Sequence, residues 1–225
     1  MNTLPCFFIK LKNKNLKRNV KFRFSMKRVG LYFVVNEAHS KEGIITDVNN
    51  AIQSGVKVVH YSEKKLRKRQ VLENAYILSA LCKKNNVLFI IEDYPDIATL
   101  VGADGVHLTQ GDFSIEHVRK MLGDEKYIGI HFTTLREAVI AEDQGANYIS
   151  IGSRAGEQQT TKATIMTLKK MKELLTVPVI AMGTFTVDQA QELFRAGVDG
   201  VALLPALYYD SDLHASMRQV LQAVR

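Results

Sequence analysis

Short runs of apolar, often β-branched residues recur along the chain and alternate with longer amphipathic stretches. Each run is nearly continuous in apolar residues, a pattern typical of parallel strands that are buried on both faces. Hairpins, which alternate apolar and polar residues, are therefore not expected. Eight such runs predict strands over residues 31–35, 56–61, 87–91, 105–108, 127–131, 148–151, 179–182 and 200–204.

The stretches between the runs have the apolar spacing and the length of crossover helices. Four of them finish in a glycine, where a helix needs a left-handed residue before the next strand: Gly55, Gly102, Gly145 and Gly197. Eight β-α units with this punctuation predict an α/β fold made of a single (β/α)₈ TIM barrel, and 225 residues suit one such domain. A doubly wound open sheet is the alternative.

Charge is distributed unevenly along the chain. The first 28 positions hold nine of the 30 basic residues and no acid, which leaves 21 basic against 23 acidic residues in the rest. We therefore expect a basic leader over 1–28, disordered or removed, and the barrel over 29–225. Organelle targeting, or binding to a membrane surface or RNA, is the alternative role for the leader.

The nearly neutral remainder carries no general nucleic-acid signal, and no segment reaches transmembrane length. The two cysteines, Cys6 and Cys82, match neither metal-ligand spacing nor a disulfide framework. This usage fits a reducing compartment, so we expect a cytoplasmic protein.

Carboxylates follow two successive predicted strands. Glu92 and Asp93 follow the third strand, and Asp112 comes shortly after the fourth. The carboxyl ends of neighbouring barrel strands share one mouth, and Mg²⁺ prefers one or two carboxylates beside water and substrate phosphates. The pair predicts a Mg²⁺ site for phosphate or diphosphate chemistry, although an aspartate in the place of Asp112 also serves as a helix N-cap.

Other polar and small residues are expected at the same mouth. Lys64 and Lys162 would supply positive charge for phosphates, and the loops after the seventh and eighth strands often cradle a phosphate on backbone N–H groups. His131 could move a proton near neutral pH, or it and His60 could simply be packed, hydrogen-bonded barrel residues. The expected substrate-binding residues are His60, Ser62, Glu92, Gln110, Thr133, Thr161, Gly183, Thr184, Leu204 and Pro205.

Several motifs resemble one family. Residues 103–112 read A-D-G-V-H-L-T-Q-G-D, which resembles A-D-G-V-H-L-G-Q-x-D of the thiamine phosphate synthase family, a family that includes the thiazole tautomerase. Thr161-Lys162 resembles the end of that family's flexible loop, and residues 178–183 and 196–202 resemble its P-V-x-A-I-G and A-G-A-D-G-V-A motifs. The resemblance covers the chain from about Gly30 to the C-terminus.

The resemblance implies a transferase that joins an aminopyrimidine diphosphate to a thiazole phosphate and releases diphosphate. By position, Asp93 and Asp112 would hold Mg²⁺, Lys64 and Lys162 would contact the diphosphate, and Gly183 with its neighbours would hold the thiazole phosphate. The expected catalytic residues are thus Lys64, Lys162 and His131, and the expected partners are these two small molecules.

The chain departs from the family pattern at several of these positions. Ser62 stands where the family has a diphosphate-binding arginine, and Glu92 where it has an asparagine; Glu92 would either recruit a cation or repel phosphate. Further departures are His131 and Thr133 in the S-x-H pattern, Thr184 at a glycine and Pro205 at a serine.

Two other functions remain open on these residues. One is a thiazole phosphate tautomerase that uses His131. The other is a non-catalytic paralogue that binds a phosphorylated ligand. The sequence does not decide whether the chain forms a homo-oligomer.

Overall fold

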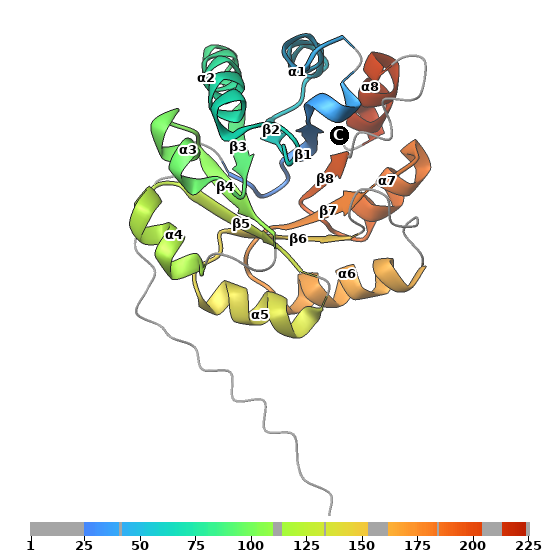
Figure 1. The fold of residues 1–225 in the computed structure, drawn as a ribbon. Coiled ribbons are helices and arrows are strands. Elements are labelled where there is room, and N and C mark those ends of the chain that lie inside the picture. Colours follow the sequence, from blue (N-terminus) through green and yellow to red (C-terminus); the bar gives the residue numbers. More distant parts are fainter. Residues whose placement is uncertain are drawn as a thin grey trace, which may run out of the picture.

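A computed structural model describes residues 25–40, 42–109, 114–132, 134–152, 162–183, 185–203 and 213–223. Eight parallel strands pair in chain order and form a closed barrel (Figure 1). This confirms the (β/α)₈ prediction and excludes the open sheet. The strands are β1 (Gly30–Val35), β2 (Val58–Tyr61), β3 (Leu88–Glu92), β4 (Gly105–Leu108), β5 (Tyr127–His131), β6 (Tyr148–Gly152), β7 (Val179–Gly183) and β8 (Gly200–Leu203).

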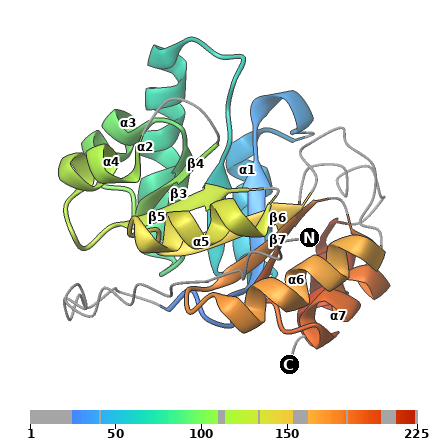
Figure 2. The ribbon, with the colours of Figure 1, turned by 90° about the horizontal axis from the view of Figure 1, so that it is seen from below.

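A helix follows each strand and lies on the outside of the barrel. Figure 2 shows α5 and α6 side by side there, and the closure of the ring brings β8 beside β1. The helices are α1 (Ile44–Gln53), α2 (Lys68–Lys84), α3 (Pro95–Leu100), α4 (Ile115–Leu122), α5 (Leu135–Asp143), α6 (Lys162–Leu174), α7 (Val187–Arg195) and α8 (Leu213–Ala223), with a short 3₁₀ helix η1 (Glu37–His39) after β1.

The predicted strands differ from the observed ones by at most two residues at either end. One difference matters for function, because β3 continues to Glu92, which pairs in register with His107 of β4. Glu92 is therefore a strand residue inside the barrel mouth rather than the first residue of a loop. The glycines predicted to end four helices all have positive φ, between 65° at Gly102 and 101° at Gly55.

The core has two layers, because successive residues of a strand point to opposite faces. In β1, Leu31, Phe33 and Val35 pack outward against the helices, whereas Tyr32 and Val34 point into the barrel. Met26, which precedes β1, is 2% exposed and packs with the interior group. Side chains thus fill the barrel below its mouth.

Among the described helices, none combines the length and apolar character needed to cross a bilayer.

Candidate active site

A pocket of about 340 Å³ opens where the described strands end. Residues after β1 and β2, including Asn36, Ser62 and Lys64, form part of its wall. Interior residues Glu92 and His131 also line it. The pocket therefore lies at the carboxyl ends of the strands, the face on which TIM-barrel enzymes carry their active sites.

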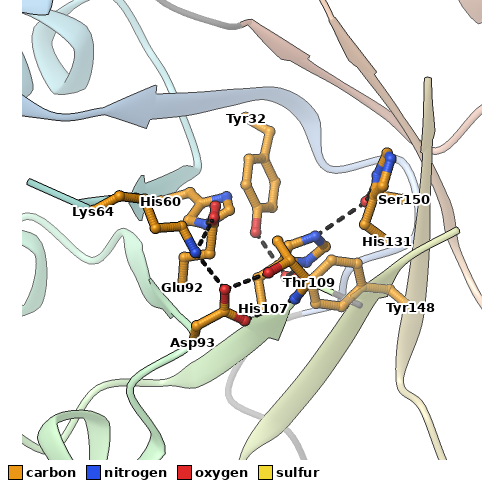
Figure 3. Close-up of polar contacts among 10 residues, drawn as sticks. All are labelled: Tyr32, His60, Lys64, Glu92, Asp93, His107, Thr109, His131, Tyr148 and Ser150. Carbon is orange, nitrogen blue, oxygen red and sulfur yellow. Dashed lines mark hydrogen bonds and ion pairs between the residues drawn. The ribbon is translucent and has the colours of Figure 1, made fainter. Parts of the chain in front are cut away.

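One side of the pocket carries a charged cluster, made of His60, Lys64, Glu92, Asp93 and Thr109. Lys64 Nζ lies 3.0 Å from Glu92 Oε1 and also pairs with Asp93 Oδ2, and Figure 3 shows the side chain reaching both acids. The other oxygen of Glu92 lies 3.1 Å from His60 Nε2. One lysine thus bridges two successive acids at the end of β3.

Two local features hold this cluster in place. Asp93 adopts a positive φ of 56°, a conformation that aspartate tolerates better than most residues, and it accepts hydrogen bonds from the backbone N–H (2.7 Å) and hydroxyl of Thr109. The buried carboxylate of Glu63 accepts from the backbone N–H groups of Lys65 (2.7 Å) and Glu37 (3.1 Å). The loop that carries Lys64 is therefore tied to the segment after β1.

Glu92 and Lys64, at the centre of the cluster, stabilise each other's charge. Burial alone would raise the pKa of Glu92, but the contact with His60 and the charge of Lys64 outweigh burial and hold that pKa well below its usual range. Burial alone would lower the pKa of Lys64, but the charge of Glu92 and the hydrogen bond to Asp93 raise it instead. Both groups are therefore ionised at neutral pH, and the negative charge that Glu92 adds is met by a protein cation.

Deeper in the barrel lies a neutral chain of five hydrogen-bonded groups. The hydroxyls of Tyr32 and Tyr148 are 2.7 Å apart, and Tyr148 contacts His107 Nδ1 at 3.0 Å. The chain continues from His107 Nε2 to the hydroxyl of Ser150 at 3.1 Å, and from Ser150 to His131 Nδ1 at 3.0 Å. These groups come from β1, β4, β5 and β6, and Figure 3 shows them beside the charged cluster.

Burial shifts the pKa of Tyr32, Tyr148 and His107 toward their neutral forms. Tyr32, Tyr148, His107 and Ser150 are 0% exposed, and His131 is 2% exposed. Burial raises the pKa of both tyrosines above their ordinary values. Burial also lowers the pKa of His107 well below its ordinary value.

Gly129 of β5 makes room for the chain. A Cβ atom added there would lie 1.9 Å from Cζ of Tyr148, far inside van der Waals contact. Any larger residue would push the Tyr148 ring away from His107. The glycine is thus required for close approach and not for a turn.

The structure brings together six of the residues expected at the site: His60, Ser62, Lys64, Glu92, Asp93 and His131. Gly183 ends β7 and is buried. Of Lys162, the structure describes only the backbone, at the first residue of α6. The other expected residues lie outside the described ranges: Gln110, Asp112, Thr133, Thr161, Thr184, Leu204 and Pro205.

The expected metal site therefore stays a prediction. Within the described ranges, no three His, Cys, Asp or Glu residues are grouped so as to hold a metal ion. Asp93, whose side chain is 23% exposed, is the described member of the predicted pair. One or two carboxylates suffice for Mg²⁺ that also binds substrate phosphates, so the donor chemistry of Asp93 fits that ion.

Sequence reasoning missed most of the neutral chain. The sequence patterns point to none of Tyr32, Tyr148, Ser150 and His107, although His107 lines the pocket. The available signal was a hydroxyl at inward-facing positions of otherwise apolar strands, since residues two apart on a strand share a face. Tyr148 and Ser150 of β6 fit that rule.

Fold and site together define an α/β-barrel protein with a lysine-carboxylate pocket at the barrel mouth. The chain belongs to the thiamine monophosphate synthase family, whose model matches residues 31–207. It is 33% identical to the thiamine-phosphate synthase of Caldanaerobacter subterraneus over 89% of this chain and 96% of that protein. It is 28% identical to the thiamine-phosphate synthase of Methanosarcina barkeri over 89% of this chain and 92% of that protein.

Solved structures agree with this assignment. The thiamine phosphate pyrophosphorylase of Pyrococcus furiosus superposes with a TM-score of 0.79 at 28% identity, covering 88% of this chain and 96% of that one. A Mycobacterium tuberculosis tryptophan synthase chain superposes with a TM-score of 0.71 at 12% identity, covering 89% of this chain and 94% of that one, which shows a shared fold alone. Of the three functions predicted from the sequence, the comparisons support the transferase and do not favour the tautomerase or the non-catalytic paralogue.

Proposed function

We propose that this chain joins an aminopyrimidine diphosphate to a thiazole phosphate and releases diphosphate, the reaction that forms thiamine phosphate. Membership of the family supports the activity, and the placement of Lys64 supports the site. Its ammonium stands at the rim of the pocket between Glu92 and Asp93, with 51% of the side chain exposed. A cation held in this way faces the space that a diphosphate would enter.

The chemistry assigned to these residues is electrostatic. As the bond between the pyrimidine methylene carbon and the diphosphate oxygen breaks, the electron pair leaves with the diphosphate, and the thiazole nitrogen then bonds to that carbon. Lys64 stabilises the negative charge that grows on the leaving group. Lys162 is proposed as the second cation.

Mg²⁺ would be held by Asp93 and Asp112, and when bound it would neutralise part of the diphosphate charge. Asp93 itself orients Lys64 through their ion pair and is oriented by Thr109. The backbone N–H groups near Gly183, Thr184 and Leu204 are proposed to hold the thiazole phosphate. Pro205 cannot take part in this way, because proline has no N–H.

Glu92 receives a specific role in this proposal. In an unpaired state it would repel phosphate, but here its two oxygens face Lys64 and His60. Glu92 therefore holds Lys64 in position through an ion pair. The asparagine of the family is uncharged and cannot form that pair. Ser62 lines the pocket without offering a cation, so Lys64 carries more of the leaving-group stabilisation than it would beside an arginine.

The test is product formation by the full chain. Thiamine phosphate should appear when both substrates and Mg²⁺ are present, and should disappear when either substrate is omitted or the metal is chelated. Absence of product from correctly folded protein under the complete conditions would rule the proposal out.

The remaining expectations concern the chain outside the site. We propose that the protein acts in the cytoplasm and that the leader predicted over 1–28 ends before Met26, because Met26 packs in the barrel interior. Mass spectrometry of the native N-terminus, combined with cell fractionation, tests both statements. Recovery in an organelle fraction would contradict the first statement, and a native N-terminus that lies beyond Met26 would contradict the second.

A further inference from the structure

His60 is a fully buried histidine that contacts the charged cluster from the barrel interior and is not among the described residues that line the pocket. Its Nε2 lies 3.1 Å from Oε2 of Glu92, and the other oxygen of Glu92 lies 3.0 Å from Lys64 Nζ. An ionised carboxylate can only accept, so the facing nitrogen of His60 carries a hydrogen. The contact does not have the direction of a straight hydrogen bond and is chiefly electrostatic.

The pairing of β2 with β3 sets this contact. His60 pairs in register with Ile90, and Glu92 lies two residues further along β3. Ile90 belongs to the interior core, as does Val58, which lies two residues before His60 on β2. Because residues two apart on a strand share a face, His60 and Glu92 both point into the barrel. The contact therefore depends on the sheet and not on a loop.

The ring of His60 is held between two aromatic rings of the neutral chain. Its centroid lies 5.5 Å from that of Tyr32, with the planes at 87°, and 5.0 Å from that of His107. Tyr32 and His107 are both hydrogen-bonded to Tyr148. Figure 3 shows the His60 ring beside Glu92. The neutral chain thus supports the charged cluster through His60.

Loss of His60 would change what Glu92 can do. The side chain of Glu92 is 10% exposed, and a buried carboxylate oxygen that loses its polar neighbour is costly. The carboxylate would then gain by turning toward the pocket and water. Lys64 would no longer be held from the interior and would be left to Asp93, the carboxylate assigned to Mg²⁺.

We propose that His60 is a positioning residue that acts through Glu92 and fixes the Lys64 ammonium where it meets the diphosphate. This role rests on the proposed function, and it assigns His60 to the orientation of the rim and not to a contact with the substrate. The affinity of the site for diphosphate therefore depends on a residue that the diphosphate does not touch.

Two substitutions of His60 test this role. A glutamine amide reaches about as far as Nε2 and can donate to Glu92, whereas an asparagine amide stops near the position of Nδ1. Calorimetry of the full-length protein with inorganic diphosphate and Mg²⁺ measures the affinity. His60→Asn should weaken binding by about tenfold and His60→Gln by less than about threefold, because only the asparagine variant loses a polar contact to a charged group. Equal losses in the two variants, or no binding to the wild type, would overturn the proposal.

A second comparison tests whether His60 acts through Glu92. In a Glu92→Gln background, His60→Asn should change the affinity for diphosphate by less than about twofold, because the route to Lys64 is already interrupted and coupled substitutions do not add. A further tenfold loss in this background would show that His60 acts on the ligand directly and would overturn the proposal.

Tyr61→Phe is the matched control for lost stability. Tyr61 follows His60 on β2 but packs with the outer core, where its hydroxyl accepts a hydrogen bond from Asn74 at 3.2 Å. The variant should be less stable in denaturant unfolding, while its affinity for diphosphate stays within about twofold of the wild type. A tenfold loss of affinity here would mean that any disturbance of β2 weakens binding, which would overturn the role of His60.

These outcomes are separable from a failure of the proposed function, because binding of inorganic diphosphate needs no turnover. If no thiamine phosphate is formed, the transferase assignment fails whatever the affinities are. If thiamine phosphate is formed while His60→Asn and His60→Gln bind diphosphate equally well, the transferase stands and the role of His60 is wrong.

Discussion

The charged cluster and the neutral chain share one barrel mouth but obey different physical constraints. In the cluster, Lys64 is 51% exposed and its charge is balanced by two carboxylates. In the chain, Tyr32, His107 and Ser150 are 0% exposed and carry no charge at neutral pH. Burying an unpaired charge is far more costly than burying a satisfied hydrogen bond. The charged side chains therefore lie at the barrel mouth, and neutral hydrogen-bonded side chains lie in the interior.

This division matches the two parts of the proposed substrate. A diphosphate needs cations that are held where negative charge grows as the bond breaks. A flat heteroaromatic ring needs fixed donors in a dry wall. Substitutions on the two sides should therefore have distinguishable effects on rate, folding and pH dependence.

The largest effect on the charged side is expected from Lys64→Ala. The rate of thiamine phosphate formation should fall by about 10²- to 10³-fold, because a group that stabilises transition-state charge is removed. Steady-state kinetics with saturating substrates measures this. The matched control is Lys68→Ala, whose lysine pairs with Asp96 at the surface with 63% of its side chain exposed, and this variant should retain nearly full activity. Equal rates for the two variants would remove Lys64 from the site.

Among the substitutions near the neutral chain, the largest loss of folding stability is expected at Gly129. Gly129→Ala places a methyl group against the Tyr148 ring and should lower the free energy of unfolding by about 3 kcal/mol. Gly145→Ala is the control, because that position has a φ of 99° but nothing within 4 Å of an added Cβ, and its cost should be about 1 kcal/mol. Denaturant unfolding measures both. The close-approach argument fails if Gly129→Ala is the milder change.

Glu92→Gln should show that the charged side is sensitive to pH. The folded-state pKa of Glu92 lies below its unfolded value, so its ionised form stabilises the fold above the ordinary carboxyl range and loses this effect as pH falls. The variant should be less stable than the wild type by about 2 kcal/mol at pH 7, and the difference should shrink below about pH 4. Chemical unfolding at several pH values measures this, and a difference that does not change with pH would argue against the ion pair.

The smallest effect is expected from Tyr32→Phe. Loss of one buried neutral hydrogen bond should cost about 1 kcal/mol. The cost should be the same at pH 5 and pH 8, because burial raises the pKa of Tyr32 and its hydroxyl stays protonated throughout. A pH-dependent cost in this interval would mean that the interior is not neutral.

The fold could be predicted from the sequence because each helix and strand has a recognisable pattern in its own local sequence. The apolar runs gave the strands to within two residues, and the positive φ of Gly55 and Gly197 follows from their place after a helix. Part of the charged cluster could also be predicted from the sequence, since Glu92 and Asp93 are adjacent in the chain and follow a strand. The family resemblance supplied the role of Lys64.

The hydrogen bonds of the neutral chain could not be predicted from the sequence in this way. Tyr32 and Tyr148 are 116 residues apart, and their contact depends on the closure of the barrel and on which face each strand turns inward. A serine or tyrosine within an apolar strand gives no local sign of its partner. Glu92 shows the complementary limit: the sequence showed an added negative charge, but only the three-dimensional arrangement shows that Lys64 and His60 face it.

The central claim is that the rim holding Lys64 and Asp93 carries out metal-dependent transfer from an aminopyrimidine diphosphate. Its most direct test is a single-turnover measurement of diphosphate release coupled to thiamine phosphate formation, in the wild type and in Asp93→Asn, across a Mg²⁺ titration. We expect release and product formation to proceed together in the wild type, and Asp93→Asn to need much more Mg²⁺ for a slower reaction. Identical Mg²⁺ dependence and rate in the two proteins would contradict the assignment.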